Sequence, residues 1–439
     1  MKKLVSLVLA LALVLCLGAA SADGEKVTIQ FWHSMSGTNA NSIDYMVEKF
    51  NASQDKIEVV ATFQGNYYDS IAKAINAVAT GTGPDLIQTG SDQVRMLSDE
   101  EGVVANLLDF MSEEEGLWYE DFVPGFIDSY RMTLADGTDY LAALPMGCST
   151  PVLYCNKTLL DKAGCEIPTT WEEMEQTLAT LVDGGYCEYG FAQPRDSWYF
   201  WMIIPNYAGQ EIFSEDGLTL ACREGGIEAF EFLKKLQFLS FFLYFGFSLC
   251  FCLFIRVKSN HSLETVYNRM MVDQKCAFYI NSIGGLAKQE SNAEAGGYEM
   301  VVAGVPGKAV NSVPSGGNSL AILQSSKHIQ ECWEFVKWLY TAEDGVAYFD
   351  YNSGYLGVTK TLQNTATLQK KMAEDPNYAN AYNFIANVNN NHRITGESDI
   401  ATEIMTFMDA VFYDLEDVTE QWDIMESAVN DKLADANDR

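Results

Sequence analysis

The stretch VTIQFWHSMSGTNANSIDYMVEKF, residues 27–50, carries the first clear structural signal of the chain. Val27–Phe31 is a short run rich in β-branched and aromatic residues. The run breaks at Ser34–Gly37, and apolar residues then recur at near-helical spacing from Asn41 to Phe50. This order predicts a strand that is followed by an amphipathic helix.

The same alternation continues along the next forty residues. Ile57–Phe63 predicts a second strand, and Tyr67–Ala79 predicts a second helix that ends at Gly81 and Gly83. A third strand is predicted at Asp85–Gln88. Because strands that alternate with helices are typical of a parallel sheet covered by helices, the start of the mature chain is predicted to be an α/β lobe.

Length and composition limit the possible classes of protein. A chain of 439 residues is too long for one compact core and suits two lobes. The net charge is −32, whereas contacts with nucleic acid or with an anionic membrane surface need clustered Lys and Arg. The charge therefore argues against both partners, but it does not exclude a small anionic ligand, since a buried pocket can be locally positive.

The N-terminus has the features of an export signal. Two lysines precede the apolar run Leu4–Leu15, and the small residues Ala20–Ala22 form a cleavage site. Residues 1–22 are therefore predicted to be a signal peptide, and the mature protein is predicted to be periplasmic or at the cell surface. A lipid anchor is not favoured, because Cys16 follows a leucine where a small residue is expected.

Three segments rich in Pro or Gly predict crossings between the lobes. Pro145 and Pro151 bracket an extended stretch, a second crossing is predicted from Gly304 to Gly317, and a third near Ser353–Tyr355. The predicted division assigns residues 23–146 and 307–357 to the first lobe, and residues 147–306 and 358–439 to the second.

The second lobe also carries local helix signals. Thr170 with Glu173 three residues later predicts a capping box, and the stretch from Ala401 onward is predicted to be helical. One segment does not fit, because Leu236–Ile255 lacks any charged residue and interrupts an amphipathic helix at Ile227–Lys235. A membrane span there would separate two halves of one lobe, so a reading-frame error over residues 236–262 is the favoured interpretation.

Six stretches of the chain resemble one known family. They are FWHSMSG from Phe31, GNYYDSIAKAI from Gly65, STPVLYCNK from Ser149, PTTWEEM from Pro168, GGNSLAI from Gly316 and SGYLGVT from Ser353. Together they resemble the family 1 extracellular solute-binding proteins of ABC importers, and within that family the glycerol-phosphate-binding subgroup. The resemblance implies a two-lobe, type II periplasmic-binding-protein-like α/β fold that closes on a ligand between the lobes and presents it to a membrane permease.

Some ligand-binding candidates follow from the residues themselves. A phosphate in a cleft is expected to be held by hydroxyls and by backbone N–H groups at a helix start. Ser149, at the first crossing, and Ser282, before a helical run, would supply hydroxyls, and Gly316 and Gly317 would let the backbone approach the ligand. A turn at Ser149, an ordinary N-cap at Ser282 and a hinge turn at the glycines fit the sequence as well.

The resemblance adds residues on the phosphate side. It implies that Tyr67 and Tyr355 contact the phosphate and that Arg393 pairs with it. Gly357 replaces the proline of the family's GYLP run, which puts the local turn after Tyr355 in doubt.

The resemblance also implies residues for the glycerol end. Trp198 and Trp201 match a Trp-x-x-Trp pair of the family, although a gapless alignment places Arg195 and Trp198 on it. Trp198 takes part in both alignments and is therefore the stronger candidate. Asp92 is expected to replace a family carboxylate that accepts hydrogen bonds from hydroxyls.

These observations predict a monomeric receptor that delivers sn-glycerol-3-phosphate or a related glycerophosphodiester to an ABC permease, without a cofactor or a metal. The alternative ligand is a neutral sugar or oligosaccharide. A secreted hydrolase is not supported, because the four histidines form no spaced metal motif and no recognisable nucleophile signature.

Overall fold

The computed structural model describes residues 26–437 except 92, 99–101, 135, 195, 239–262, 309–310 and 390–396. The predicted signal peptide, Asp92 and Arg393 lie outside the described residues, as does the anomalous apolar segment from residue 239 onward. The beginning of that segment, through Phe238, continues a helix, and Leu236 is only 2% exposed within the core of the second lobe.

The first lobe is built on a five-stranded sheet with the order β2-β1-β3-β12-β6. β1 pairs in parallel with β2 and with β3, as the sequence predicts, whereas β12 is antiparallel to both β3 and β6. The sheet is therefore mixed, because the chain returns from the second lobe to insert β12. The strands are β1 (Val27–His33), β2 (Ile57–Phe63), β3 (Leu86–Gly90), β6 (Leu144–Ser149) and β12 (Gly316–Ile322).

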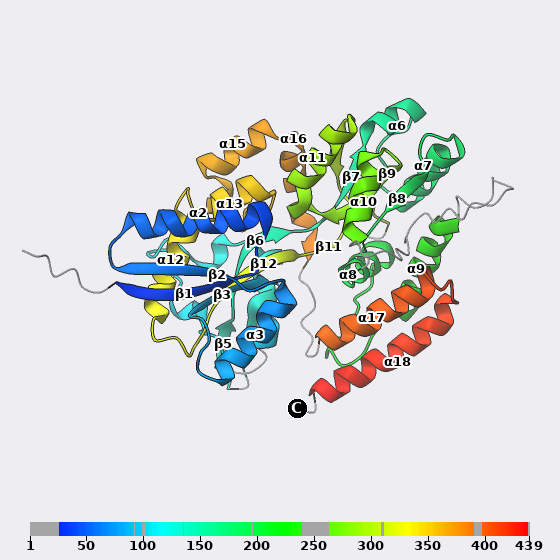
Figure 1. Cartoon of the computed structure of the whole chain (residues 1–439). Helices are drawn as coiled ribbons and strands as arrows, with labels where there is room; N and C mark the ends of the chain where they lie inside the picture. The colour runs from blue at the N-terminus through cyan, green and yellow to red at the C-terminus, as the bar shows by residue number, and fades with distance from the viewer. Residues whose placement is uncertain are drawn as a thin grey trace, which may run out of the picture.

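Helices cover both faces of this sheet, with α2 and α13 on one side and α3 on another (Figure 1). α2 begins at Gly37, four residues before the predicted start. The sequence pattern missed this first turn because it contains no large apolar residue. The elements are α2 (Gly37–Ser53), α3 (Tyr67–Ala79), α4 (Arg95–Ser98), α5 (Pro124–Ile127), β4 (Arg131–Thr133), β5 (Asp139–Leu141), α12 (Ile329–Thr341), α13 (Val346–Ser353), α14 (Lys360–Gln363) and α15 (Ala366–Glu374).

The second lobe has a four-stranded sheet with the order β10-β7-β9-β8. Its strands are β7 (Pro151–Asn156), β8 (Tyr189–Ala192), β9 (Cys276–Ser282) and β10 (Met300–Ala303). Its helices are α6 (Lys157–Ala163), α7 (Trp171–Asp183), α8 (Trp198–Ile203), α9 (Arg223–Phe238), α10 (Leu263–Val272), α11 (Leu286–Gly296), α16 (Pro376–Tyr382), α17 (Glu397–Phe412) and α18 (Val418–Asn437). The predicted capping box of Thr170 and Glu173 is confirmed at the start of α7.

The first crossing between the lobes takes place at Thr150, between β6 and β7. The second occurs later than the predicted boundary at residue 307. Gly307 still pairs with Thr170, and Asn206 Nδ2 still donates to the Ser312 carbonyl at 3.3 Å, so the chain leaves the second lobe only after β11 (Val313–Pro314).

The third crossing also differs from its predicted place at residue 357. Gly354, with φ +92, is the left-handed C-cap of α13 and not a crossing. Thr359 pairs with Phe122, and α15 packs on α13, so this part of the chain remains on the first lobe. The chain crosses near Asp375, after which α16 packs against β10.

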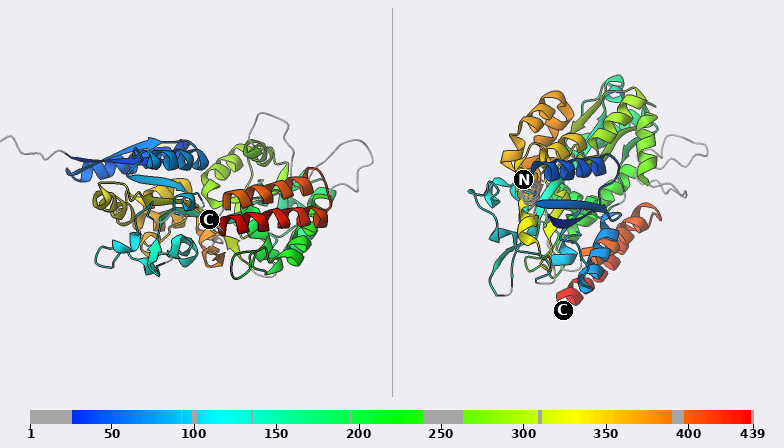
Figure 2. Two further views of the ribbon diagram at one scale, coloured as in Figure 1. Left: turned by 90° about the horizontal axis from the view of Figure 1, so that it is seen from below. Right: turned by 60° about the vertical axis from the view of Figure 1, so that its left-hand side comes forward.

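The two lobes lie side by side, and α17 and α18 run together along the second (Figures 1 and 2). No helix in the described ranges is both long enough and apolar enough to cross a membrane. No group of histidine, cysteine and carboxylate side chains within those ranges could hold a metal ion, and no disulfide joins the seven cysteines they contain.

Candidate functional site

Three paired strand positions of the first lobe lie where it meets the second lobe. Gly90 on β3 pairs with Asn318 on β12, which in turn pairs with Gly147 on β6. A Cβ atom at Gly90 would lie 2.8 Å from the ring of Tyr67, and one at Gly147 would lie 3.1 Å from the ring of Tyr355. The two glycines therefore make room for the two tyrosines on either side of a fully buried Asn318.

The structure brings the predicted residues Tyr67 and Tyr355 close enough together for each side chain to affect the pKa of the other. Burial raises the pKa of both hydroxyls. The Gln88 side chain acts against this rise in the pKa of Tyr67, and the Tyr67 and Asn318 side chains act against it in the pKa of Tyr355. Both tyrosines therefore stay neutral at physiological pH and can donate a hydrogen bond.

Sequence reasoning missed Gln88 and Asn318. Both side chains are 0% exposed, and each belongs to a strand that also contains buried apolar residues. A polar residue inside a buried strand must find a partner or serve a function, and this signal could have identified both. Gln88 also ties the site to the first strand–helix loop, because its Oε1 accepts a hydrogen bond from the Ser34 backbone at 3.0 Å.

A second group of predicted residues meets at the second crossing. A Cβ atom at Gly316 would lie 2.7 Å from the indole of Trp198 and 3.2 Å from Ser149 Oγ. Trp198 Nε1 donates to the Ser315 carbonyl at 2.9 Å, so this tryptophan of the second lobe lies directly against the crossing strand. Ser149, Trp198 and Gly316 are thus adjacent.

Trp201 is not brought to this group. It is 8% exposed, and its ring packs against Phe200 and Phe213 with centroids 5.5 and 5.7 Å away. These contacts belong to the core of the second lobe, so the three-residue spacing of the two tryptophans does not give them one common role.

Ser282 caps a short helical turn, Ile283–Gly285, that leads into α11. Its Oγ accepts a hydrogen bond from the Gly284 backbone at 3.1 Å, so the alternative of an ordinary N-cap is confirmed. The turn nevertheless lies at the junction, because a Cβ atom at Gly284 would be 2.7 Å from the ring of Tyr355. Tyr355 is therefore held between Gly147 of the first lobe and Gly284 of the second.

The structure explains the glycine at position 317 by the local backbone, and not by the predicted close approach of the backbone to a ligand. Its φ is +114, and a Cβ atom there would lie 2.0 Å from the Gly147 carbonyl oxygen. The pairing of β12 with β6 is irregular at the next residue, Asn318. The close approach is therefore between two strands, and it sets the position of Asn318.

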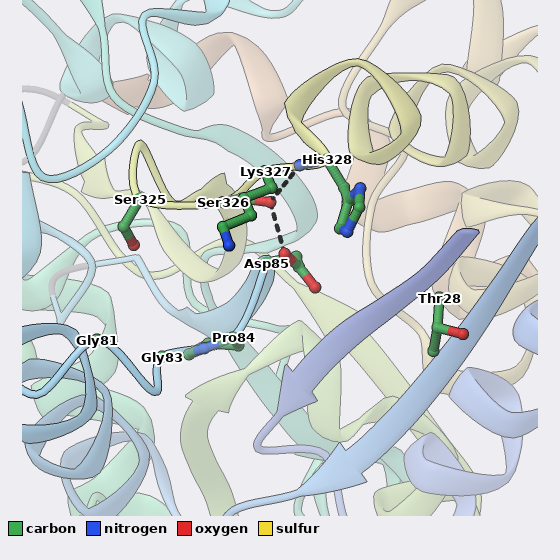
Figure 3. Close-up of a pocket in the computed structure, with 9 residues that line it drawn as sticks. All are labelled: Thr28, Gly81, Gly83, Pro84, Asp85, Ser325, Ser326, Lys327 and His328. Atoms are coloured by element: carbon green, nitrogen blue, oxygen red, sulfur yellow. Dashed lines mark hydrogen bonds between the residues drawn. The ribbon is translucent and has the colours of Figure 1, made fainter.

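Two hollows on the first lobe contain carboxylates that already have hydrogen-bond or ion-pair partners. One, of about 260 Å³, contains Asp85, whose carboxylate accepts from Ser326 Oγ and from the Gln30 backbone (Figure 3). Asp85 precedes β3, so this hollow lies at the opposite end of the strand from Gly90.

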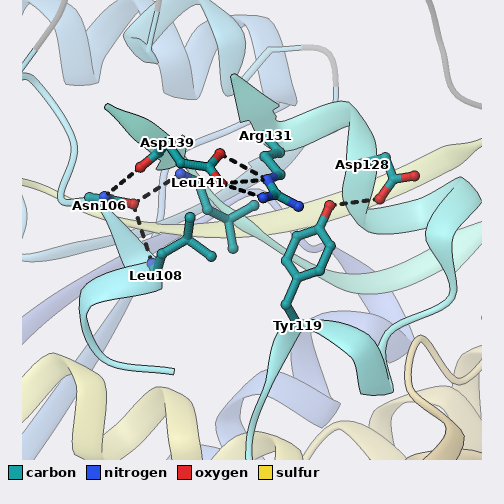
Figure 4. A network of polar contacts seen from close by, with 7 residues as sticks. All are labelled: Asn106, Leu108, Tyr119, Asp128, Arg131, Asp139 and Leu141. Atoms are coloured by element: carbon teal, nitrogen blue, oxygen red, sulfur yellow. Dashed lines mark hydrogen bonds and ion pairs between the residues drawn. The ribbon is translucent and has the colours of Figure 1, made fainter. Parts of the chain in front are cut away.

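The other hollow contains the ion pair of Arg131 with Asp139, and Tyr119 donates to Asp128 at 2.6 Å (Figure 4). Its charged groups already have partners within the protein, so they do not need a ligand to satisfy them. The junction between the lobes is the stronger candidate site.

Comparison with known proteins agrees with this architecture. Residues 45–380 match the family model described as bacterial extracellular solute-binding protein. This chain is a bacterial extracellular solute-binding protein. The family predicted from the sequence is confirmed, and it is a family of binding proteins and not of enzymes. Such a protein is the extracytoplasmic component of an ABC importer, which binds a small ligand and hands it to a membrane permease.

The curated relatives include the sn-glycerol-3-phosphate-binding periplasmic protein UgpB of Escherichia coli K12, which is 27% identical over 376 residues, or 80% of this chain and 78% of the relative. UgpB of Yersinia pseudotuberculosis is 27% identical over 380 residues, 81% of this chain and 80% of the relative.

Solved structures show the same fold. UgpB from Mycobacterium tuberculosis in complex with glycerophosphocholine superposes with a TM-score of 0.77 at 18% identity, and covers 94% of this chain and 99% of its own. The cyclic α-maltosyl-1,6-maltose binding protein from Arthrobacter globiformis gives 0.75 at 18% identity, with 94% and 100% covered. The predicted α/β periplasmic-binding-protein fold is confirmed.

A titratable cluster lies at the third crossing of this solute-binding protein. Lys371 at the end of α15 pairs with Asp375 at 2.8 Å, and Asp375 caps α16. Glu290 on α11 faces this pair, and burial together with the Asp375 carboxylate raises its pKa to about 7, against a smaller opposing effect of Lys371. Glu290 is thus protonated below neutral pH in the folded protein.

We expect this raised pKa to make the free energy of unfolding fall as the pH rises from about 4.5, the ordinary value, to about 7. Over that range the folded protein holds a proton that the unfolded chain releases, so its stabilisation is complete below 4.5 and lost above 7. Glu290→Gln should abolish this slope and be more stable than wild type at pH 8 by roughly 1–2 kcal/mol, a value reduced for the partial exposure of the side chain.

Urea unfolding at pH 5, 6, 7 and 8 would measure this effect. Glu294→Gln, one turn further along α11 and exposed, is the matched control and should keep the wild-type slope. An unchanged slope in Glu290→Gln would assign the pH dependence to other groups.

Proposed function

We propose that this binding protein carries sn-glycerol-3-phosphate or a related glycerophosphodiester to its ABC permease. The observation that carries the proposal is the pair of neutral tyrosine hydroxyls, Tyr67 and Tyr355, at the junction of the lobes. A phosphate ester presents several acceptor oxygens, and hydrogen bonds to a charged oxygen are stronger than neutral ones. The partly buried indole of Trp198 offers an apolar face to the glycerol carbons.

Other junction residues support the same ligand. The hydroxyl of Ser149 lies beside Gly316 and Trp198, and the Ser282 turn faces Tyr355. Asp92 and Arg393 are proposed on the resemblance alone, as the hydroxyl-accepting carboxylate and the phosphate-pairing arginine. The curated relatives named above support the proposal, since they are named for sn-glycerol-3-phosphate.

A neutral sugar is the second candidate. It is supported by the superposition on the maltosyl-maltose binding protein with a TM-score of 0.75, and by the tryptophan at the crossing, since an indole can stack on a sugar ring as well. The two candidate ligands differ in charge, so they can be distinguished by comparing how charged and neutral compounds stabilise the protein.

We expect sn-glycerol-3-phosphate to raise the thermal stability of the purified mature protein and glycerol to leave it unchanged. At about a hundred times the dissociation constant, a ligand that binds only the folded state adds about 2.7 kcal/mol of apparent stability. A thermal-shift series with sn-glycerol-3-phosphate, glycerophosphocholine, glycerol and maltose measures this. Stabilisation by maltose, with none by either phosphate compound, would overturn the proposal in favour of the sugar.

A further inference from the structure

Helix α16 is bonded to both lobes through two different sets of side chains. On the second lobe Asn377 holds β10, because its Oδ1 accepts a hydrogen bond from the Val302 backbone at 2.9 Å and its Nδ2 donates to the Met300 carbonyl at 3.4 Å. On the first lobe the hydroxyls of Tyr378 and Tyr382 bond to the backbone that follows α13. These two tyrosines are four residues apart and therefore lie on one face of the helix. α16 thus holds a segment of the first lobe from an anchor on the second.

The backbone that α16 holds belongs to the candidate ligand-binding residue Tyr355 and to Gly357, two residues later. The Tyr378 hydroxyl donates to the Tyr355 carbonyl at 2.7 Å, and the Gly357 N–H donates to the Tyr382 hydroxyl at 2.8 Å. A proline at position 357, as in the GYLP run of the family, has no N–H and could not make the second of these bonds. The turn after Tyr355 is therefore held by Tyr382 in place of a proline ring.

The direction of each of these hydrogen bonds follows from the atoms involved. A carbonyl oxygen only accepts, so the single hydroxyl proton of Tyr378 is used on the Tyr355 carbonyl. The two tyrosine hydroxyls lie 3.2 Å apart, and the proton between them must therefore come from Tyr382. The Tyr382 oxygen in turn accepts from Gly357. The four groups form one chain of hydrogen bonds in which each bond polarises and strengthens the next.

The backbone held in this way carries a ring that is closely packed. The Tyr355 ring stacks on that of Phe349, with centroids 5.6 Å apart and an angle of 14° between the planes. A Cβ atom at Gly147 or at Gly284 would lie 3.1 or 2.7 Å from the same ring. The Tyr378 hydroxyl fixes the carbonyl of this residue, so its loss would loosen the backbone torsions that aim the Tyr355 hydroxyl. A binding group that is held less rigidly binds its ligand less tightly.

We propose that Tyr378 and Tyr382 are positioning residues that hold Tyr355 in its ligand-binding orientation from the second lobe. The pair raises the affinity of the site without touching the ligand, because it fixes the backbone of the residue whose hydroxyl makes the contact. A ligand contact of the first lobe thus depends on a helix anchored to the second. The inference rests on the proposed function and deepens it, since it names the residues that keep one ligand contact in place.

Tyr378→Phe removes the hydroxyl and keeps the ring. We expect calorimetry to show sn-glycerol-3-phosphate binding about fivefold weaker or worse, the factor for loss of one hydrogen bond. Tyr382→Phe should give a smaller loss, because Tyr378 still donates to Tyr355 in that variant. Tyr382 is only partly buried whereas Tyr378 is 0% exposed, so the second variant keeps the test usable if the first folds poorly.

Tyr140→Phe is the matched control for the loss of a tyrosine hydroxyl. Tyr140 on β5 is buried, and its hydroxyl donates to a backbone carbonyl, that of Val104, at 2.6 Å. Both partners belong to the first lobe and lie away from the junction. We expect Tyr140→Phe and Tyr378→Phe to lower the urea midpoint by similar amounts, while only Tyr378→Phe lowers the affinity.

A double-mutant cycle with Tyr355→Phe separates positioning from general structure. Tyr355→Phe should weaken binding, and adding Tyr378→Phe to it should weaken binding no further, because Tyr378 acts through that hydroxyl. Losses that multiply, a wild-type affinity in Tyr355→Phe, or an affinity of Tyr378→Phe within about twofold of wild type would each overturn the inference.

The inference and the proposed function can fail separately. A wild-type protein that binds maltose and not sn-glycerol-3-phosphate would overturn the proposed function, and the same variants titrated with maltose would then decide the positioning role. A measurement on the ligand-free protein needs neither compound. With isotope-labelled tyrosine rings, the NMR signals of Tyr355 should shift in Tyr378→Phe and stay in place in Tyr140→Phe. Unshifted signals in Tyr378→Phe would show that its hydroxyl does not position Tyr355.

Discussion

Replacing Trp422 by alanine is expected to lower the free energy of unfolding by about 3–5 kcal/mol, the range for truncating a large aromatic side chain in a core. Trp422 on α18 is 0% exposed. Its indole lies 5.8 Å from the ring of Phe200 on α8 and 5.5 Å from that of Phe407 on α17. Gly226 on α9 completes the contact, since a Cβ atom there would lie 1.9 Å from the indole. One side chain thus joins four helices, and its truncation would leave a cavity among them.

Urea unfolding of the mature protein would measure this loss, with Ile424→Ala as the matched control. Ile424 lies two residues further along the same helix and is 62% exposed, so its truncation should change stability by no more than about 0.5 kcal/mol. Equal losses in the two variants would show that α18 does not dock through the face that carries Trp422.

Local signals predicted the secondary structure of the first lobe well. The helix Tyr67–Ala79 and the strand Ile57–Phe63 have the bounds that the sequence predicts, because both carry clear periodicity and end at turn residues. The Thr170 capping box was also predictable, since its two partners lie three residues apart. Each of these features depends on residues that are close together in the chain.

Long-range features were harder to predict, and the third crossing shows why. Gly354 has the same sequence signal whether it ends a helix or begins a crossing, and only packing of α15 on α13 shows that the chain stays on the first lobe. The same limit applies to Trp198 and Trp201. Their spacing is that of one helical turn, yet one lies against the crossing strand and the other packs in the core.

The site illustrates the limit most directly. Tyr67 and Tyr355 entered the prediction through a resemblance, and the structure brings them together. Gln88 and Asn318 did not enter it, because a polar residue in a strand becomes a signal only once the burial of that strand is known. The position of Asn318 depends on its pairing with Gly90 and Gly147, which joins three segments far apart in the chain.

Gly317→Ala is expected to lower stability by about 2–4 kcal/mol, because it combines backbone strain with a steric clash. The φ of +114 is unfavourable for any residue with a Cβ atom, and that atom would lie 2.0 Å from the Gly147 carbonyl oxygen. β12 would have to move away from β6, and Asn318, the next residue, would move with it. We therefore expect weaker ligand binding in calorimetry as well as a lower unfolding midpoint in urea.

Gly137→Ala separates the two causes of this loss. Gly137 has a φ of +88, but a Cβ atom there would have nothing within 4 Å, so this variant carries the strain without the clash. It should lose only about 1 kcal/mol and keep wild-type affinity, because it lies in the turn between β4 and β5 and away from the junction. If Gly317→Ala proved no less stable than Gly137→Ala and bound ligand equally well, the close approach of β12 to β6 would not be what positions Asn318. The glycine would then serve only the turn of the chain between the lobes.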